Sequence, residues 1–246
     1  MGGFANNAPI VTDGLVFYVD AGNDNSYPGI GTTWSDLVGD NDGSFEPASG
    51  PTYSSSNGGS IAFDGTDDRV DIGYAPEGQS SITVCSWFKT TKTTRQVLIG
   101  AYSGFDATNS NAFSIDLNRG SAINEQDSIF YFARIGTGSS NSQFSYATNT
   151  SLSNGDWHFI AVTHDLPTGS VTINVDNTNY SVTNTASSSA GPWGSFEFNL
   201  KIGANNSQGT INNFVDGQVA CMSIYNRVLS SLEITQNYNA LKNRFV

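Results

Sequence analysis

The sequence is poor in basic residues: Lys and Arg together number 10 of its 246 residues, against 22 Asp and Glu. The formal net charge at pH 7 is therefore −12. Binding to nucleic acid depends on clustered Lys and Arg that neutralise phosphate groups, so we expect no nucleic-acid partner. Solubility alone can explain the excess of acidic residues, and the alternative is that a few carboxylates bind a divalent cation.

The sequence also has few cysteines and no long apolar run. Cys85 and Cys221 are its only cysteines, and both lie in segments that read as strands. A chain of this size does not need a disulfide, so we expect two buried thiols, with one disulfide between them as the alternative. No apolar run approaches the ~18 residues of a membrane-spanning helix, and the first residues lack the basic and apolar regions of a signal peptide. We therefore expect no membrane insertion. We also expect no export by a signal peptide, with a leader already removed from this sequence as the alternative.

Common patterns of catalytic residues are missing as well. The sequence contains no Gly-x-Ser-x-Gly, no His-Glu-x-x-His and no Cys-x-x-Cys. Its two histidines, His158 and His164, lie at opposite ends of one expected strand, and we expect a structural role for His158. We therefore expect no catalytic residues and no enzymatic activity, and a polysaccharide hydrolase or lyase is the least favoured alternative.

Aromatic residues make up 12% of the sequence and glycine accounts for 26 residues, a mixture typical of short strands joined by polar turns. Alternating apolar and polar residues, with turn residues between them, predict a chain made almost wholly of strands. Residues 44–60 are rich in Ser, Gly and Pro and predict a loop. The predicted strands are 15–19, 61–63, 69–72, 82–88, 96–100, 112–117, 128–135, 157–163, 171–175, 180–183, 196–202 and 219–225.

One helix is predicted near the end of the chain, over about residues 230–243. Ser230 and Glu233 have the spacing of a capping box. An apolar stripe follows at helical spacing: Leu232, Ile234, Tyr238 and Leu241. Without an internal repeat or a linker, the sequence predicts one domain over residues 13–246, preceded by an N-terminal arm over residues 1–12.

Several segments, in their order and spacing, resemble the laminin-G-like family of concanavalin A-like jelly rolls. The resemblance implies an all-β fold, a two-sheet antiparallel jelly-roll sandwich with one short C-terminal helix. Trp34, Trp87 and Trp157 lie in matching segments and are expected to be structural. The matching segments are 14–23 with 34–37, the Phe-Asp-Gly turn at 63–70, 81–89, 157–163 and 224–230.

The opening over residues 20–37 and the ending over residues 237–245 are similar to jelly-roll domains in structural proteins of tailed bacteriophages. This resemblance implies a non-enzymatic virion protein: a capsid decoration, head fibre or adhesin. Such a protein is made in the host cytoplasm and displayed on the virion surface. Its expected partners are other virion proteins, further copies of itself and host-surface glycans. The arm would dock it through Phe4, Pro9 and Ile10, and the main alternative is a carbohydrate-binding module or lectin.

Glucanases of this superfamily place three acids on one strand as Glu-x-Asp-x-Glu, because glycoside hydrolysis needs paired carboxyl groups. The sequence has no such triplet. The nearest approach is Glu125-Gln126-Asp127, which lies in a predicted loop and has Ile129 in the place of the third acid. The absence of this triplet therefore favours a protein that binds a ligand and does not catalyse a reaction.

The resemblance also implies a structural Ca²⁺ on loops at the edge of the sandwich, and no other cofactor. Calcium prefers carboxylate and carbonyl oxygens, and the expected ligands are Asp20, Asp64 and Asp216. Weaker candidates are Asp24, Asp67 and Asp68. The alternative is that these aspartates only form turns by accepting hydrogen bonds from nearby backbone amides.

Glycan binding needs exposed aromatic faces beside amide and carboxylate groups. Tyr102 and Phe105 lie in the expected polar loop 100–111, and Trp193 lies in the loop 184–194. These three residues are the expected glycan contacts. The alternative is that they cover the core or pack against neighbouring subunits.

Overall fold

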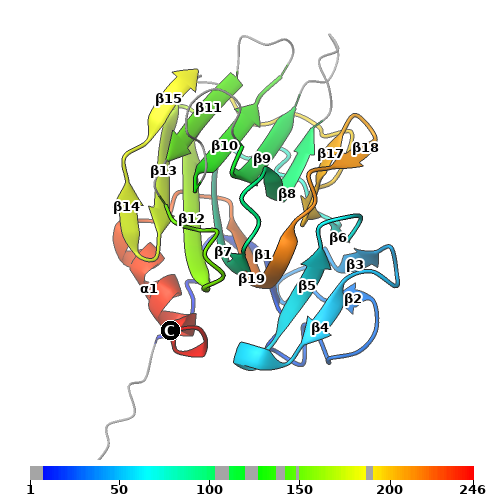
Figure 1. The fold of residues 1–246 in the computed structure, drawn as a ribbon. Helices are drawn as coiled ribbons and strands as arrows, with labels where there is room; N and C mark the ends of the chain where they lie inside the picture. The colour runs from blue at the N-terminus through cyan, green and yellow to red at the C-terminus, as the bar shows by residue number, and fades with distance from the viewer. Residues whose placement is uncertain (1–7, 103–110, 120–126, 137–141, 148–149, 187–190) are drawn as a thin grey trace, which may run out of the picture.

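Two sheets lie face to face in the computed structural model, which describes residues 8–102, 111–119, 127–136, 142–147, 150–186 and 191–246 (Figure 1). Their strands pair antiparallel, except for one parallel pair between two strands of the second sheet. The first sheet has eight strands in this described part. In spatial order they are β14 (Thr178–Tyr180), β13 (Ser170–Val175), β12 (His158–Asp165), β7 (Ser81–Thr90), β19 (Asp216–Tyr225), β5 (Ser60–Asp64) and β4 (Thr52–Ser54), with β1 (Leu15–Asp20) also paired to β19.

The second sheet has eleven strands in the described residues. Its main path is β15 (Thr183–Ala186), β11 (Ser142–Ala147), β10 (Ile129–Arg134), β9 (Ala112–Leu117), β8 (Gln96–Tyr102), β16 (Lys201–Ile202), β6 (Arg69–Ile72), β3 (Gly43–Glu46) and β2 (Thr33–Trp34). A hairpin of β17 (Asn205–Ser207) and β18 (Thr210–Asn212) joins the sheet where β17 pairs with β8. The two-sheet sandwich predicted from the sequence is therefore confirmed.

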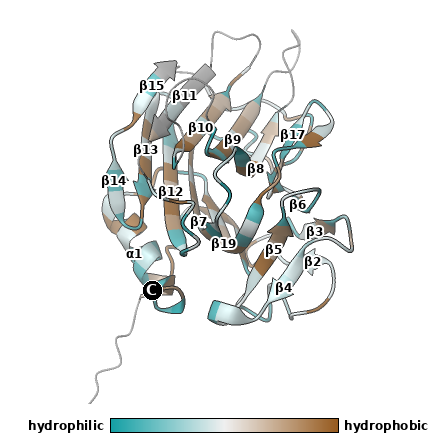
Figure 2. Cartoon of the chain, in the orientation of Figure 1, coloured by the Kyte–Doolittle hydropathy of each residue, from teal (hydrophilic) through white to brown (hydrophobic). Residues whose placement is uncertain are grey.

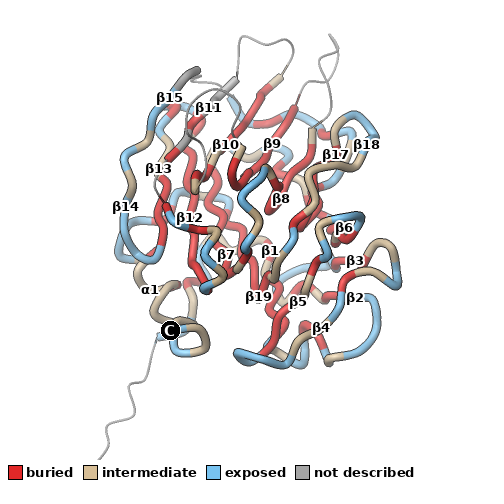
Figure 3. Tube along the Cα trace, in the orientation of Figure 1, coloured by how far each residue is buried: buried red, intermediate tan, exposed pale blue. Residues whose placement is uncertain are grey.

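The main core fills the space between the two sheets. The hydropathy of Figure 2 and the burial of Figure 3 agree on this, because the central strands are both apolar and buried. Alternation along β7 shows how the sequence achieves it: Val84 and Phe88 join the main core, whereas Cys85 and Trp87 lie on the opposite face of the strand. Both faces of β7 are covered, which is why nearly all of its residues are buried.

A second apolar cluster covers the outer face of the first sheet, where helix α1 (Ser231–Leu241) and the short 3₁₀ turn Lys242–Arg244 pack on it. The Trp87 ring stacks on two rings from this end of the chain, with centroids 5.5 Å from Tyr238 and 4.6 Å from Phe245. The predicted capping box is present, because the Ser230 side chain accepts from the Glu233 backbone amide and Glu233 bonds back to Ser230. The helix therefore closes the sheet face that lies away from the main core.

Part of the predicted arm packs on this helix. Val11 is buried in the second cluster, and its backbone amide donates to Asn237 Oδ1 at 2.8 Å. Pro9 is exposed, Ile10 is half-buried, and Phe4 lies outside the described residues. The described end of the arm is thus joined to the domain, which differs from an arm that stays clear of the core.

Two further expectations differ from the structure, and the expectation of two buried thiols is confirmed. The segment 44–60, expected as a loop, contains β3, β4 and a 3₁₀ turn (Ser56–Gly58), because strand pairing overrides its Ser, Gly and Pro content. The strand expected over 196–202 is reduced to β16. Cys85 and Cys221 are buried free thiols, and burial raises the pKa of both. Among the described residues no helix is long and apolar enough to span a membrane.

Candidate functional site

A hollow of about 390 Å³, which we call the basin, opens on the second sheet beside β8, β9 and β10. Its other wall is the β17–β18 hairpin, which lies at the opposite end of the molecule from α1 in Figure 1. Ligand pockets have volumes of about 300–1,000 Å³, so the basin has room for a short saccharide. Its principal side chains are Arg95, Arg119, Arg134, Tyr102, Phe132 and Asn205.

Period-two alternation places Phe132 and Arg134 of this set on the outer face of the sheet, together with Asp116. Along β9, Phe113 and Ile115 point into the main core, so Ser114 and Asp116 point outward. Along β10, the neighbours of Phe132 and Arg134 belong to the core in the same way. The outer face of these strands is therefore polar and aromatic, while their inner face is aliphatic and aromatic.

Arg134 lies deep in the basin, with only 2% of its surface exposed. Its Nη1 donates to the Tyr102 hydroxyl at 2.8 Å, and its guanidinium lies 5.2 Å from the centre of the Tyr102 ring and 5.4 Å from that of Phe132. A buried cation is costly unless neighbouring groups compensate it, and the hydroxyl and the two ring faces are among the groups that do so here. Burial raises the pKa of Tyr102, so the phenol stays protonated at neutral pH.

Asp116 holds the other two arginines at the basin. Its carboxylate is fully buried, and its Oδ2 accepts from Arg95 Nε at 2.9 Å and lies 2.7 Å from Arg95 Nη2. The same oxygen lies 3.7 Å from Arg119 Nη1. The Arg119 guanidinium also lies 4.1 Å from the centre of the Phe130 ring. Arg95 and Arg119 keep about a third of their side-chain surface exposed, so solvent and ligands can reach both.

Backbone contacts with β8 hold the hairpin wall in place. The Gln208 amide donates to the Tyr102 carbonyl at 3.0 Å, and the Val97 amide donates to the Asn213 carbonyl at 2.8 Å. Gly100 permits this close approach, because a Cβ there would come within 2.9 Å of the Ser114 side chain and 3.1 Å of Asn205 Oδ1. Asn205 is more than nine-tenths buried, and its Oδ1 has no hydrogen-bond partner in the described part of the chain.

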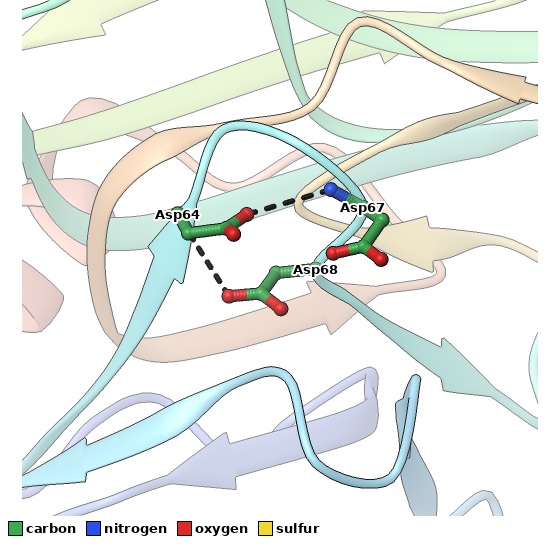
Figure 4. A group of neighbouring side chains, drawn as sticks. All are labelled: Asp64, Asp67 and Asp68. Carbon is green, nitrogen blue, oxygen red and sulfur yellow. Dashed lines mark hydrogen bonds between the residues drawn. The ribbon is translucent and has the colours of Figure 1, made fainter.

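A second polar site lies at the turn between β5 and β6. Figure 4 shows that the side chains of Asp64, Asp67 and Asp68 converge, and their nearest carboxylate oxygens all lie within 4.8 Å of one another. Asp64 Oδ1 accepts from the Thr66 amide at 2.8 Å, and Asp68 Oδ2 accepts from the Asp64 amide at 2.9 Å. Burial raises the pKa of Asp68, and the charges of Asp64 and Asp67 act in the same direction. These contacts fit a turn held by aspartates.

The structure does not bring the three expected calcium ligands together. Asp20 is opposite Cys221 and Asp64 is opposite Asp216 across β19, so roughly 15 Å of strand separates the two positions. Both carboxylate oxygens of Asp20 accept from Arg244 Nη1, at 2.8 and 2.9 Å. Asp20 thus anchors the C-terminal segment. Calcium binding by the chain stays a prediction, and any ion at the β5–β6 turn would meet Asp67 and Asp68 besides Asp64.

The three expected glycan contacts have different positions. Tyr102 is half-buried and lines the basin. Trp193 is only 1% exposed and meets Phe113 and His164 edge-on in the main core, so it offers no face to a ligand. Phe105 lies outside the described residues, as does Glu125 of the acidic triplet nearest to a catalytic pattern.

Sequence reasoning missed the arginines, Asp116, Phe132 and Asn205. A signal was available for part of this set, because alternation in AFSIDL (112–117) and IFYFAR (129–134) leaves Asp116, Phe132 and Arg134 facing away from the core. No pattern in the sequence indicated that the hairpin would bring Asn205 to the basin, because β17 pairs with a strand about a hundred positions earlier.

Comparison with solved structures finds the same fold in glycan-related proteins. Domain 4 of AbnA, an extracellular arabinanase from Geobacillus stearothermophilus solved with arabinotriose, aligns with a TM-score of 0.63 at 16% identity, over 91% of this chain and 98% of that domain. The binding domain of botulinum neurotoxin DC, solved with SialylT, aligns with a TM-score of 0.61 at 11% identity, over 93% of this chain and 52% of that one.

The Trypanosoma rangeli sialidase solved with sialic acid aligns with a TM-score of 0.60 at 12% identity, over 97% of this chain but only 35% of the sialidase. A search of curated protein sequences finds no match. The family model described as the concanavalin A-like lectin/glucanase superfamily, of laminin-G type, matches residues 64–235, which is most of the domain. The chain therefore belongs to this laminin-G-like branch of the concanavalin A-like superfamily.

Proposed function

We propose that the chain is a non-catalytic carbohydrate-binding domain and that the basin is its saccharide site. The observation that carries this proposal is the convergence of Tyr102, Phe132, three guanidinium groups and Asn205 in one hollow of suitable size. Aromatic rings offer apolar faces to a sugar ring, while guanidinium and amide groups hydrogen-bond its oxygens. Similarly folded domains have been solved with arabinotriose and with SialylT, which supports the same class of ligand here.

The surroundings of the basin favour binding without catalysis. Glycoside hydrolysis uses two carboxyl groups on either side of the scissile bond. None of the described residues that line the basin is an acid. Asp116, on β9 beside the basin, is fully buried and paired with Arg95. We therefore expect the domain to retain a saccharide without cleaving it.

Binding to a glycan array, followed by titration calorimetry on the best ligand, tests this proposal. We expect Phe132→Ala and Tyr102→Ala each to weaken binding about tenfold or more, because each removes a ring from the basin. Leu232→Ala is the matched control, since this side chain is 83% exposed on α1, at the far end of the molecule. Equal affinities for all four proteins, or release of shorter sugars during the assay, would contradict the proposal.

We further propose that the domain works on the surface of a phage particle, where it docks through its N-terminal arm and contacts host glycans. This setting follows from the resemblance of the opening and ending segments to phage structural proteins. The contacts of Val11 sharpen the test: deletion of residues 1–10 removes Phe4, Pro9 and Ile10 and leaves the bond from Val11 to Asn237 in place. We expect the full chain to sediment with purified particles and the deletion variant to remain in the supernatant. Equal sedimentation of the two would contradict docking by the arm.

A further inference from the structure

We propose that Asn205 sets the specificity of the basin, because its amide oxygen accepts a hydrogen bond from one particular hydroxyl group of the saccharide. This inference rests on the proposed function, namely that the basin is the saccharide site. A ligand must then carry a free hydroxyl at one ring position. Inversion, substitution or removal of that hydroxyl weakens binding, whereas the same change elsewhere on the sugar has less effect.

The β17–β18 hairpin carries three asparagines whose side-chain oxygens are used differently. Asn206 Oδ1 accepts from the Gly209 amide at 2.9 Å and so holds the hairpin turn, and Asn212 Oδ1 accepts from Asn213 Nδ2 at 2.6 Å. Asn205 Oδ1 has no partner among the described residues, although the residue is only 7% exposed. Asn205 is therefore the hairpin asparagine whose oxygen makes no bond within the described fold.

The hairpin presents Asn205 to the basin from a fixed position. Asn205 and Ser207 line the basin, and by alternation Asn206 faces the other side of the strand. Gln208 and Gly209 form the two-residue turn, and their φ values of 54° and 81° are those of a type I′ hairpin. The bond from the Gln208 amide to β8 anchors this turn. Asn205 is thus held in place before a ligand arrives, which reduces the entropy lost on binding.

The burial of the Asn205 oxygen makes a bond to it more valuable than an ordinary one. A hydrogen bond to a ligand usually gains little, because both groups give up bonds to water when they meet. Asn205 Oδ1 is already buried in the folded protein, so only the sugar hydroxyl must lose water. The oxygen now lies above Gly100, and the terminal torsion of an asparagine side chain is soft enough to turn it towards a hydroxyl in the basin. We therefore expect this one bond to weigh heavily in the choice of ligand.

Replacement of single hydroxyl groups by fluorine tests this inference, because fluorine on carbon cannot donate a hydrogen bond. The probes are lactose, arabinotriose and the saccharide that the glycan array ranks first, each beside analogues that carry fluorine at one hydroxyl position. Calorimetry measures their affinities for the wild type. We expect one position of at least one saccharide to lose about tenfold or more in affinity on fluorination, since the buried oxygen then stays unpaired.

Two variants assign this loss to Asn205. Asn205→Ala and the nearly isosteric Asn205→Leu remove the acceptor, so the parent saccharide should bind about tenfold more weakly. In these variants the parent and its sensitive fluorinated analogue should bind equally, because the two changes remove the same bond. Asn243→Ala is the matched control, since it removes an exposed amide from the turn after α1, at the far end of the molecule, and should change nothing.

The outcomes separate this inference from the proposed function. Uniform binding of every fluorinated series to the wild type overturns the inference, and this measurement needs no variant to fold. A loss on fluorination that persists in Asn205→Ala and Asn205→Leu also overturns it. Both results leave the proposed function standing, because the parent saccharides still bind. No binding of any saccharide, here or on the array, overturns both proposals.

Discussion

At the scale of single residues, burial sets the chemistry of the side chains in the main core. His164 is fully buried, its Nδ1 lies 2.8 Å from the Tyr131 hydroxyl, and its Nε2 has no partner among the described residues. Burial lowers the pKa of His164 to about 4, so the ring stays neutral in the folded protein at pH values where it would be charged in the unfolded chain.

The stability of the fold should therefore fall as the pH falls from about 6.5 towards 4. In this window the unfolded state binds more protons than the folded state, so acid favours unfolding. We expect His164 to account for a loss of about 2 kcal/mol between pH 7 and pH 5. Urea unfolding of the wild type and of His164→Asn at both pH values measures it, and the variant should lose less stability between them. The same loss in both proteins would contradict this assignment.

At the scale of elements, the sequence predicted the ends of α1 better than its buried face. The capping box formed as expected because it depends on neighbours three positions apart. Leu232, placed in the apolar stripe, is 83% exposed, whereas Asn237 is buried because it bonds Val11 and the Tyr225 hydroxyl. Hydropathy at helical spacing could not indicate a polar residue whose partners lie on other elements.

The capping box gives a prediction for this helix. Ser230→Ala removes the side chain that accepts from the Glu233 amide, and such caps contribute about 1 kcal/mol to stability. Glu233 also bonds Arg227 Nη2 at 2.6 Å, an interaction that lowers the pKa of Glu233 to about 2. Urea unfolding should show the loss for Ser230→Ala and a smaller change for Ser231→Ala, the exposed neighbour within the helix. The cap would have no role if both variants were equally stable.

At the scale of the whole molecule, the two-sheet sandwich could be predicted because each strand carries its own alternation and each turn its own Gly, Asn or Asp. The turn at Asp176 and Asn177 shows this, since both have the positive φ of a type I′ hairpin. The basin could not be predicted, because segments near residues 95, 116, 134 and 205 meet only after the sheet and the hairpin have formed. Tyr102 was proposed as an aromatic residue in a segment expected to be a polar loop, although it is the last residue of β8. Alternation along β10 pointed to Arg134, whereas Arg95 and Arg119 needed the fold.

The most direct test of the basin as the saccharide site is chemical-shift mapping of backbone amides during titration with the best ligand from the glycan array. We expect the shifted amides to cluster on β8, β9, β10 and the β17–β18 hairpin, and Phe132→Ala to abolish these shifts. Shifts centred on the β5–β6 turn or on α1, with the amides of the basin unchanged, would contradict it.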